Sequence, residues 1–436
     1  MSQRIAIVGS GIAGLGAAWA LQSSNEVVVY EADSRIGGHS NTVDVPTSEG
    51  VTSVDTGFIV YNEVTYPNLT RLFETLNVPT EFSDMSFAFS MDGRLEYAAS
   101  LGGVLAQPSN LLRTRFRAML RDIGRFRRTG AELSPTDHET VDDLFSRHGF
   151  SAGFREDYLY PMAGAIWSAG RAEIGSYPAQ SILEFLANHG LIEIVGRPRW
   201  KTVTGGSRSY VERLTAGFRD NIRLETPVTG ITRDRGQVEV HSREGSEVFD
   251  HVVLATHSDQ AIEILGPGVT QRERDLLAAI PYQDNVAFLH SDPALMPTRR
   301  RVWSSWNALA ASDLGDAGVA SVTYWMNRLQ NLDTRVPLFV SLNPLHEPKS
   351  ELVHATFSYV HPQFGTKAIP AQRGIAEIQG LNNTWFAGAY LGYGFHEDGL
   401  QSGLNVAAAL GSPAPWHGSF APMSSAPAPA RIGSSG

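Results

Sequence analysis

Acidic, basic and glycine residues gather near the C-terminal end of the chain. The stretch YLGYGFHEDGLQSGLNVAAAL, residues 390–410, places His396, Glu397 and Asp398 directly before a run of small residues. Histidine and carboxylate side chains are the usual proton acceptors in catalysis. The run after them predicts a helix, whose first turn offers free N–H groups and a partial positive charge. Two interpretations fit: His396 or Glu397 acts on a substrate, or both only cap the loop and Asp398 is the helix N-cap.

A glycine-rich turn follows the first apolar run of the chain. Gly9, Gly11 and Gly14 form a G-x-G-x-x-G pattern, and Glu31 ends the next apolar run seventeen residues after Gly14. Gly9 permits a tight turn, Gly11 lets a pyrophosphate approach the backbone, and Gly14 lets a helix pack on a strand. A carboxylate at Glu31 would accept hydrogen bonds from a ribose. The pattern predicts a dinucleotide site that also includes Ile12, Ala13 and Ala32, and a glycine turn without a ligand is the alternative.

These residues need a scaffold of strands and helices to position them. Apolar runs at 5–8 and 27–30 predict strands on either side of a helix of small residues at 13–21. Residues 221–256 predict a small meander that returns to a parallel strand, and TWFAGAY, residues 384–390, predicts one more short strand before the late helix. We therefore expect an α/β fold with a Rossmann-like sheet.

The spacing of these blocks predicts a discontinuous first domain with an inserted second domain. The first, nucleotide-binding domain is expected to comprise residues 1–80, 200–270 and 376–411. Residues 81–199 and 271–375 are long enough for an α+β substrate-binding domain. The last segment, 412–436, is rich in Ser, Pro, Ala and Gly and predicts a disordered tail.

Composition excludes several classes of chemistry. The chain has 436 residues, no cysteine and a net charge of −10. Disulfides, thiolate nucleophiles, iron–sulfur clusters and cysteine zinc sites are excluded, and no metal site is predicted. The negative charge argues against general nucleic-acid binding. No apolar run is long enough to span a bilayer, and we expect a cytoplasmic protein.

One segment is strongly basic and amphipathic. Between residues 110 and 128, an apolar stripe is formed by Leu112, Phe116, Met119, Leu120 and Ile123, and Arg113, Arg117, Arg121, Arg125 and Arg128 lie opposite. Residues 113–128 carry seven arginines and one aspartate. Such a helix is typical of a membrane-surface element, which would place the protein peripherally on the inner membrane face. The alternative is a helix whose stripe packs on the second domain while its arginines pair with nearby acids.

The order of the motifs resembles that of the flavin-containing amine oxidase and phytoene desaturase superfamily. The segment EADSRIGGHSNT, residues 31–42, matches its acid, Arg, Gly-Gly and Thr positions at Glu31, Arg35, Gly37, Gly38 and Thr42, with His39 where an arginine is usual. Further matching segments are VDTGF at 54–58 with Gly57 and Phe58, WKTVTGGSRSYVERL at 200–214, TPVTGI at 226–231 with Val228, Phe386-Ala387-Gly388, and Asp398-Gly399-Leu400.

The resemblance implies FAD as the cofactor and hydride removal from a substrate carbon as the reaction. It implies that the backbone of Val228 meets the adenine and that Gly57 lets the backbone pass near the isoalloxazine. The amides after Asp398 would face the end of the ring that becomes negative on reduction. Tyr61 and Tyr393 are further candidates, in the wall of the site.

GYGFHEDGLQSG, residues 392–403, resembles a bacterial branch that is associated with modified fatty acyl chains. This implies desaturation of a methylated or otherwise modified, phospholipid-bound acyl chain at the membrane surface. Amine oxidation is the alternative, although many such oxidases use a lysine and none occurs between Lys201 and Lys349. A non-catalytic lipid-binding carrier is an alternative of another class. The oligomeric state is left open.

Overall fold

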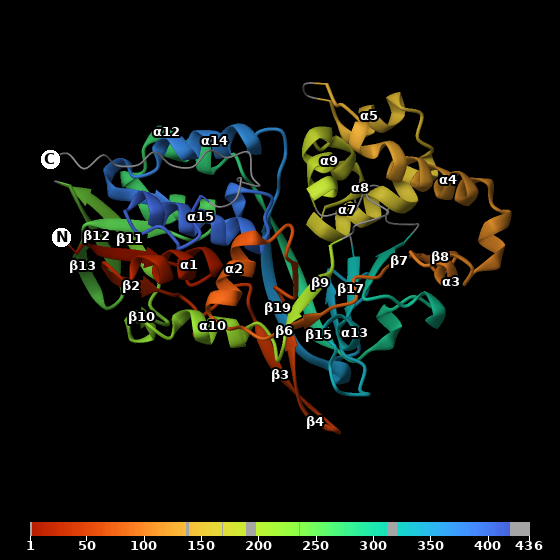
Figure 1. The fold of residues 1–436 in the computed structure, drawn as a ribbon, viewed down its shortest axis with the longest axis horizontal. Coiled ribbons are helices and arrows are strands. Elements are labelled where there is room, and N and C mark those ends of the chain that lie inside the picture. Colours follow the sequence, from red (N-terminus) through yellow and green to blue (C-terminus); the bar gives the residue numbers. More distant parts are fainter. Residues whose placement is uncertain are drawn as a thin grey trace.

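The chain folds around two large sheets, one parallel and one mixed. The computed structural model describes residues 2–136, 139–167, 169–188, 198–234, 236–311 and 321–418. Figure 1 shows the parallel sheet and its helices at the left, and the mixed sheet with a separate group of helices at the right. The long strands β15 (Tyr282–His290) and β19 (Val353–Pro362) run between these two halves.

The parallel sheet carries the predicted dinucleotide motif. Its five strands have the order β10 (Ile222–Arg223), β2 (Glu26–Tyr30), β1 (Arg4–Val8), β14 (His251–Leu254) and β20 (Thr384–Phe386). All four neighbouring pairs are parallel. The strands β1, β2 and β14 are almost continuous apolar runs because a parallel sheet is covered on both faces. Three separate segments of sequence thus build one sheet, as the motifs predict.

Two helices of small residues pack closely beside this sheet. Helix α1 (Ile12–Leu21) contacts α15 (His396–Ala409) along its length. A Cβ atom at Gly403 would lie 2.1 Å from the carbonyl oxygen of Ala13, and one at Gly16 would lie 2.6 Å from a methyl of Leu400. The small residues of both helices, such as Gly16 in α1 and Gly403 in α15, therefore let the two helix backbones approach each other.

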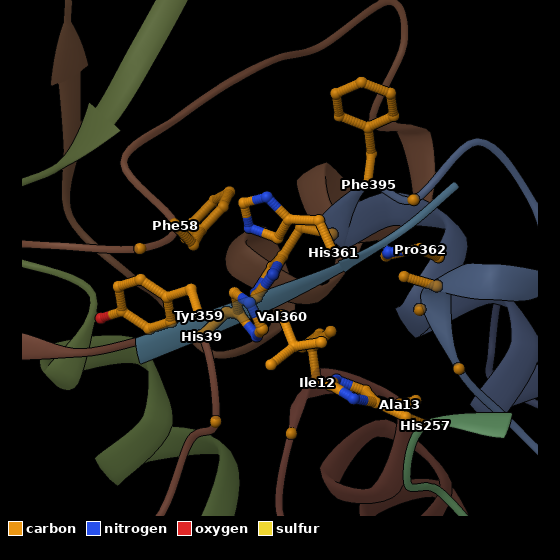
Figure 2. Close-up of a pocket in the computed structure, with 18 of the residues that line it drawn as sticks. Ile12, Ala13, His39, Phe58, His257, Tyr359, Val360, His361, Pro362 and Phe395 are labelled. Atoms are coloured by element: carbon orange, nitrogen blue, oxygen red, sulfur yellow. The ribbon is translucent and has the colours of Figure 1, made fainter. Parts of the chain in front are cut away.

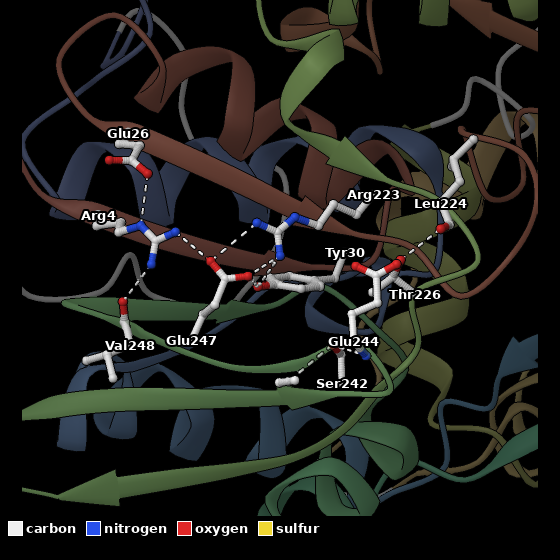
Figure 3. A network of polar contacts seen from close by, with 11 residues as sticks. Arg4, Glu26, Tyr30, Arg223, Leu224, Thr226, Ser242, Glu244, Glu247 and Val248 are labelled. Carbon is white, nitrogen blue, oxygen red and sulfur yellow. Dashed lines mark hydrogen bonds and ion pairs between the residues drawn. The ribbon is translucent and has the colours of Figure 1, made fainter.

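An ion-pair network ties the meander to the parallel sheet (Figure 3). The meander consists of the antiparallel strands β11 (Val228–Asp234), β12 (Gln237–Ser242) and β13 (Gly245–Phe249). Glu247 in β13 pairs with Arg223 and with Arg4, whose Nη2 atom lies 2.6 Å from the carboxylate. Arg4 also pairs with Glu26 at 2.8 Å, so the network joins the first, second and tenth strands to the meander.

The second sheet is the frame of the other half of the molecule. Its seven strands have the order β19, β15, β18 (Phe339–Leu342), β17 (Ser321–Trp325), β16 (Trp306–Ala310), β7 (Phe87–Met91) and β8 (Leu95–Ala98). Neighbours are antiparallel except β16 and β7. Every one of these strands comes from 81–199 or 271–375, the ranges that the sequence assigns to an inserted domain.

The remaining elements connect or cover these sheets. The short strands are β3 (Thr42–Thr47), β4 (Gly50–Asp55), β5 (Val60–Asn62), β6 (Thr80–Phe82) and β9 (Trp200–Val203). The helices of the second half are α3 (Leu101–Val104), α4 (Thr114–Thr129), α5 (Val141–Arg147), α6 (Ala152–Phe154), α7 (Tyr160–Trp167), α8 (Arg171–Ser176), α9 (Ala179–Asn188) and α13 (Met326–Leu329). The others are α2 (Pro67–Thr75), α10 (Arg208–Thr215), α11 (Ser258–Leu265), α12 (Gln271–Leu277) and α14 (Ala368–Ile378).

The basic segment differs from its predicted form. The helix begins at Thr114, and Leu112 ends a separate 3-10 turn, η1 (Pro108–Leu112). Phe116 and Met119 are fully buried in the core of the second half, with Leu120 packed against it. The stripe residues within the helix therefore pack on the protein core, and the expectation that they face a membrane is wrong, whereas Leu112, before the helix, is exposed.

The arginines of the same helix divide into two groups. Arg115 pairs with Asp157 at 2.6 Å and with Glu156 at 2.7 Å. Arg125 lies over the ring of Phe150, with its guanidinium carbon 3.8 Å from the ring centroid. Four others are exposed at the surface, namely Arg113 at the N-cap and Arg117, Arg121 and Arg128 in the helix.

The first part of the predicted tail is packed. Trp416 stacks on Trp19 with ring centroids 5.6 Å apart, and its Nε1 donates to Asn68 Oδ1 at 2.9 Å. The predicted disordered tail is therefore wrong for residues 412–418, and residues 419–436 lie outside the described part of the chain. No helix among the described residues is long and apolar enough to cross a membrane.

Candidate active site

A cavity of about 720 Å³ extends from the parallel sheet into the second half of the molecule. Fourteen of the residues predicted for the site line it: Gly9, Gly11, Ile12, Ala13, Glu31, Ala32, Gly38, His39, Gly57, Phe58, Val228, Gly388, His396 and Gly399. They come from the glycine turn and α1, the segment after β2, the loop after β4, the meander, and the segment from β20 into the late helix. The fold thus brings together motifs that lie almost 400 residues apart in the sequence.

The glycine turn leaves open backbone at the start of α1. Gly9 has φ +103°, and a Cβ there would lie 2.7 Å from the carbonyl oxygen of Ala255. Gly11 precedes α1 without a side-chain cap, and a Cβ at Gly11 would meet no atom within 4 Å. The first N–H groups of the helix therefore lie beside open space, which fits a pyrophosphate.

Glu31 is held at the end of β2 by the same turn. Its Oε2 atom accepts hydrogen bonds from the backbone N–H of Ser10 at 2.9 Å and from the Ser10 hydroxyl at 2.5 Å. Its Oε1 atom accepts from the N–H of Asp33 at 2.9 Å. The carboxylate is fixed in the cavity wall beside the glycine turn, where it fits the predicted ribose contact.

Three predicted cofactor residues lie behind the lining. A Cβ at Gly14 would lie 2.0 Å from the carbonyl oxygen of Gly9, so Gly14 serves the close packing of helix and strand. Gly37 has φ +115° and donates its N–H to the carbonyl oxygen of Ser10 at 3.0 Å. Arg35 turns toward Asp33, with 3.5 Å between Nε and the carboxylate. The packing role predicted for Gly14 is therefore confirmed, whereas Gly37 and Arg35 shape the turn and do not line the cavity, which corrects their prediction as cofactor-contact residues.

The late helix presents Gly399 to the cavity, whereas its acidic side chains, Glu397 and Asp398, do not line the cavity. Asp398 accepts from the N–H groups of Tyr393 at 3.0 Å and Phe395 at 2.9 Å, so it folds the loop before α15. Burial raises the pKa of Asp398 to about 7. Leu400 is fully buried against α1. Asp398 is the third residue of α15 and the N-cap is Phe395, so the alternative of Asp398 as the N-cap is wrong. The Asp398 and Leu400 side chains fold the loop and pack on α1, and the prediction that the backbone amides after Asp398 face the cofactor stays a prediction.

Glu397 caps a second helix and is not part of the cavity wall. Its carboxylate accepts from the backbone N–H groups of Asn68 at 2.9 Å and Leu69 at 3.0 Å, at the start of α2. Burial raises its pKa to about 7, although these hydrogen bonds oppose the shift. The capping interpretation holds for Glu397, and its prediction as a catalytic residue is wrong.

His396 lines the cavity and positions the neighbouring side chain of Phe58. Its ring stacks on Phe58 with centroids 3.9 Å apart, and its Nε2 atom lies 2.6 Å from the Tyr210 hydroxyl. Burial lowers the pKa of His396 to about 3, so the ring is neutral at neutral pH and weakly basic. Such a ring is a poor proton acceptor, and its contacts hold Phe58 in the cavity wall.

Tyr61 lies in the core beneath the cavity. Its side chain is buried, and its ring meets Phe73 edge to face at 5.2 Å and Tyr66 at 6.3 Å. Tyr66 lines the cavity, whereas Tyr61 does not. The prediction of Tyr61 as a catalytic residue is therefore wrong, and the tyrosine supports the wall from behind.

A group of half-buried histidines lines the cavity (Figure 2). The ring centroid of His39 lies 5.1 Å from that of Tyr359 and 5.5 Å from that of His361. Burial lowers the pKa of His361 to about 4 and lowers that of His39 as well. His257 stacks on Tyr282 at 4.6 Å. No lysine or arginine occurs among the described residues of the lining, so these three rings and that of His396 supply its only basic side chains.

The far end of the cavity is an apolar chamber. We define it by Val60, Met85, Phe87, Met162, Ile166, Trp306, Tyr324, Val340 and Leu342. They come from β5, β7, α7, β16, β17 and β18 and the loop before β7. None of them is charged, and sequence reasoning missed them because they belong to no local motif.

A dinucleotide cradle that opens into an apolar chamber defines the site of a dinucleotide-dependent oxidoreductase. Residues 12–331 match the model of the flavin-containing amine oxidoreductase family, and the chain belongs to this family. The α/β fold class and the superfamily resemblance predicted from the sequence are confirmed. FAD is the cofactor, and the open turn at Gly11 and the fixed carboxylate of Glu31 fit it.

Several solved structures share the fold. Putrescine oxidase bound to putrescine aligns with a TM-score of 0.67 and 16% identity, over 94% of this chain and 99% of that chain. Cyclohexylamine oxidase from Brevibacterium oxydans aligns with 0.66 and 20%, over 94% and 99%. The CLA-producing fatty acid isomerase from P. acnes aligns with 0.63 and 16%, over 92% and 97%.

Proposed function

We propose that this FAD-dependent oxidoreductase dehydrogenates a lipophilic substrate, most specifically a methylated or otherwise modified fatty acyl chain. The observation that supports the proposal is the apolar chamber, whose nine defining residues carry no charge. A hydrocarbon chain gains about 0.8 kcal/mol for each CH₂ group that it buries in such surroundings. A charged substrate would lose its hydration there without finding a partner.

The reaction would transfer a hydride from one carbon to a hydride acceptor and a proton from the neighbouring carbon to a base, and leave a double bond between the two carbons. FAD, when bound, supplies the hydride acceptor. The chain's own residues would hold the acyl chain, exclude water and orient the aromatic wall, in which His396 fixes Phe58. The N-terminus of α15 at Gly399 would stabilise negative charge that develops beside it.

Amine oxidation is the second candidate function, because two of the similar structures are amine oxidases. A neutral amine could enter an apolar aromatic site. However, no lysine lines the described cavity, and Lys201 instead pairs with Glu63 outside it. The fatty acid isomerase among the similar structures agrees with an acyl substrate, without assigning one to this chain.

Anaerobic bleaching of the flavin absorbance tests the substrate class. The purified yellow protein is mixed with phospholipids that carry plain or methyl-branched acyl chains, with the corresponding free fatty acids, with carotenoids and with aliphatic amines. We expect bleaching by the acyl compounds and an olefinic product of two mass units less. Bleaching by amines alone overturns the proposal. A folded protein that binds acyl chains but takes up no flavin would support the carrier alternative.

A further inference from the structure

We propose that the outer end of the second half is a docking surface for an anionic phospholipid membrane. We call it the leucine–arginine surface and define it by Leu105, Leu111, Leu112, Arg94, Arg113, Arg117, Arg300 and Arg301. It is distinct from the apolar stripe of α4, which is buried. Figure 1 places α3 and α4, which flank it, at the end of the molecule away from the parallel sheet.

Three large apolar side chains protrude within eight residues. Leu112 is 82% exposed, Leu105 47% and Leu111 36%. Full exposure of such a side chain costs about 1.5–3 kcal/mol relative to full burial, and Leu112 comes nearest to this limit. Single exposed leucines are common, but an apolar group rimmed by charge is typical of an interaction site.

The backbone holds these leucines outward on a rigid support. Asn110 is fully buried, and its Nδ2 donates to the carbonyl oxygen of Glu96 at 3.0 Å. Gln107 accepts from the N–H of Glu96 at 2.8 Å and donates to the carbonyl oxygen of Arg94 at 2.9 Å. These bonds fix η1 on β8. Asn110 is buried while the next two residues of the turn, Leu111 and Leu112, are exposed.

Positive charge surrounds the leucines although the chain is acidic overall. Arg113 and Arg117 are exposed, and neither has an ion-pair partner within the described part of the chain. The turn η7 (Arg300–Val302) contacts α3 and β8, and its Val302 packs with Ala98 and Ala106. Arg300 and Arg301 are exposed on the same turn. The nearby carboxylate of Glu96 is buried and already pairs with Arg299 at 2.8 Å.

This combination fits a lipid surface better than a nucleic acid. Leucines can enter the boundary between headgroups and acyl chains while arginines meet the phosphates, each contributing about 1 kcal/mol near an anionic membrane. A nucleic acid would use the arginines and leave the leucines in water. The inference deepens the proposed function, because a docked enzyme lies beside a supply of acyl chains. The surface itself is argued from exposure and charge, independently of the substrate.

Co-sedimentation of the holoenzyme with vesicles tests the docking surface. The vesicles contain phosphatidylcholine alone or phosphatidylcholine with phosphatidylserine. We expect binding only to the anionic vesicles and weakening by added salt. Leu112→Glu, and Arg113→Glu combined with Arg117→Glu, should each weaken binding by roughly tenfold or more.

Matched controls separate docking from damage to the fold. Leu381→Glu replaces a 54% exposed leucine in the other half, and Arg243→Glu reverses an exposed arginine on the meander, so both should bind as wild type does. Flavin content and melting temperature should be unchanged in all variants. Equal sedimentation of all proteins, or none with anionic vesicles, overturns the inference. A wild-type dimer that Leu112→Glu dissociates would assign the surface to a second copy and also overturn it. Because no turnover is measured, this result is independent of the bleaching panel.

Discussion

The residues of the cavity divide into those that touch its space and those that shape it. Gly11 and Gly399 present backbone to the cavity. The carboxylates of Asp398 and Glu397 instead accept hydrogen bonds from backbone N–H groups, of the loop before α15 and of the start of α2 respectively. His396 is the residue between these groups, since it lines the cavity and also fixes Phe58. In the segment 396–399, the carboxylates of Glu397 and Asp398 therefore stabilise the fold, and Gly399 lines the site.

Gly11 offers the sharpest test of cofactor placement. Replacement by valine puts a branched side chain into space where a Cβ meets no protein atom within 4 Å, so the fold should persist. The same side chain would occupy the position of the pyrophosphate beside α1, and we expect flavin content to fall at least tenfold. Absorbance at the flavin bands of the purified protein, with circular dichroism as the measure of folding, gives the answer.

Gly365→Val is the matched control, because a Cβ there also meets no atom within 4 Å and lies outside the cavity lining. It should keep its flavin. A Gly11→Val protein that is as yellow as the wild type would show that the pyrophosphate lies elsewhere.

At the scale of elements, buried acids at helix ends hold the cavity walls. Glu397 joins α15 to the start of α2, and through it the late helix is attached to residues that support Tyr66. Its raised pKa has a consequence for stability. Between its usual pKa near 4.5 and the folded value of about 7, the folded protein holds a proton that the unfolded chain has released. Rising pH therefore destabilises the folded state through this group.

Glu397→Gln should remove this pH dependence. A shift from 4.5 to about 7 corresponds to a loss on the order of 3 kcal/mol in wild-type stability between pH 4.5 and 7, and glutamine carries no such proton. We expect the free energy of unfolding of Glu397→Gln, relative to that of the wild type, to increase from pH 5 to pH 8. Urea unfolding at both pH values measures it. The exposed substitution Glu212→Gln is the control, and parallel curves for wild type and Glu397→Gln would contradict the expectation.

Local motifs made the first half of the fold predictable, and long-range contacts hid the rest. The segment from Gly9 to Glu31 is one continuous unit of turn, helix and strand. Each of its glycines and its acid has a defined structural role, so its structure can be predicted from local sequence. The end of the basic helix depended instead on a buried hydrogen bond from Asn110 to Glu96, which no helical periodicity reveals. Leu112 belongs to the turn that this hydrogen bond attaches to β8, and not to α4, and its side chain is exposed. The prediction therefore placed the exposed Leu112 in the same apolar stripe as the buried Phe116 and Met119.

The chamber could not be predicted for the same reason at a larger scale. Trp306 and Tyr324 face each other across neighbouring strands with ring centroids 4.8 Å apart, yet each stands in an ordinary strand sequence. Met85 and Met162 join them from a loop and a helix. Only the topology of the seven-stranded sheet, which interleaves β7 with strands more than 200 residues later, assembles these side chains into one wall.

The whole molecule combines a cofactor site formed by local motifs, around the glycine turn and Glu31, with an apolar chamber formed by long-range packing. The length of the chamber can therefore be altered by substitution without changing the cofactor site, which we call the cradle. Ile166 on α7 is half-buried and lines the chamber. Tryptophan at this position should fill space that an acyl chain would occupy, while the cavity of about 720 Å³ can accept it without distorting the core. Flavin content should stay at the wild-type level, because no residue of the cradle changes.

If the chamber holds the substrate, Ile166→Trp should discriminate by chain length. Losing two or three buried CH₂ groups costs about 2 kcal/mol, so the longest acyl chains should bleach the flavin roughly thirtyfold less efficiently. Short chains that end before Ile166 should react as with the wild type, and Ile166→Val should preserve the long-chain reaction. The measurement is the anaerobic bleaching rate as a function of chain length and concentration. Equal loss for all lengths would indicate a damaged site, and no loss for any would place the acyl chain outside the chamber.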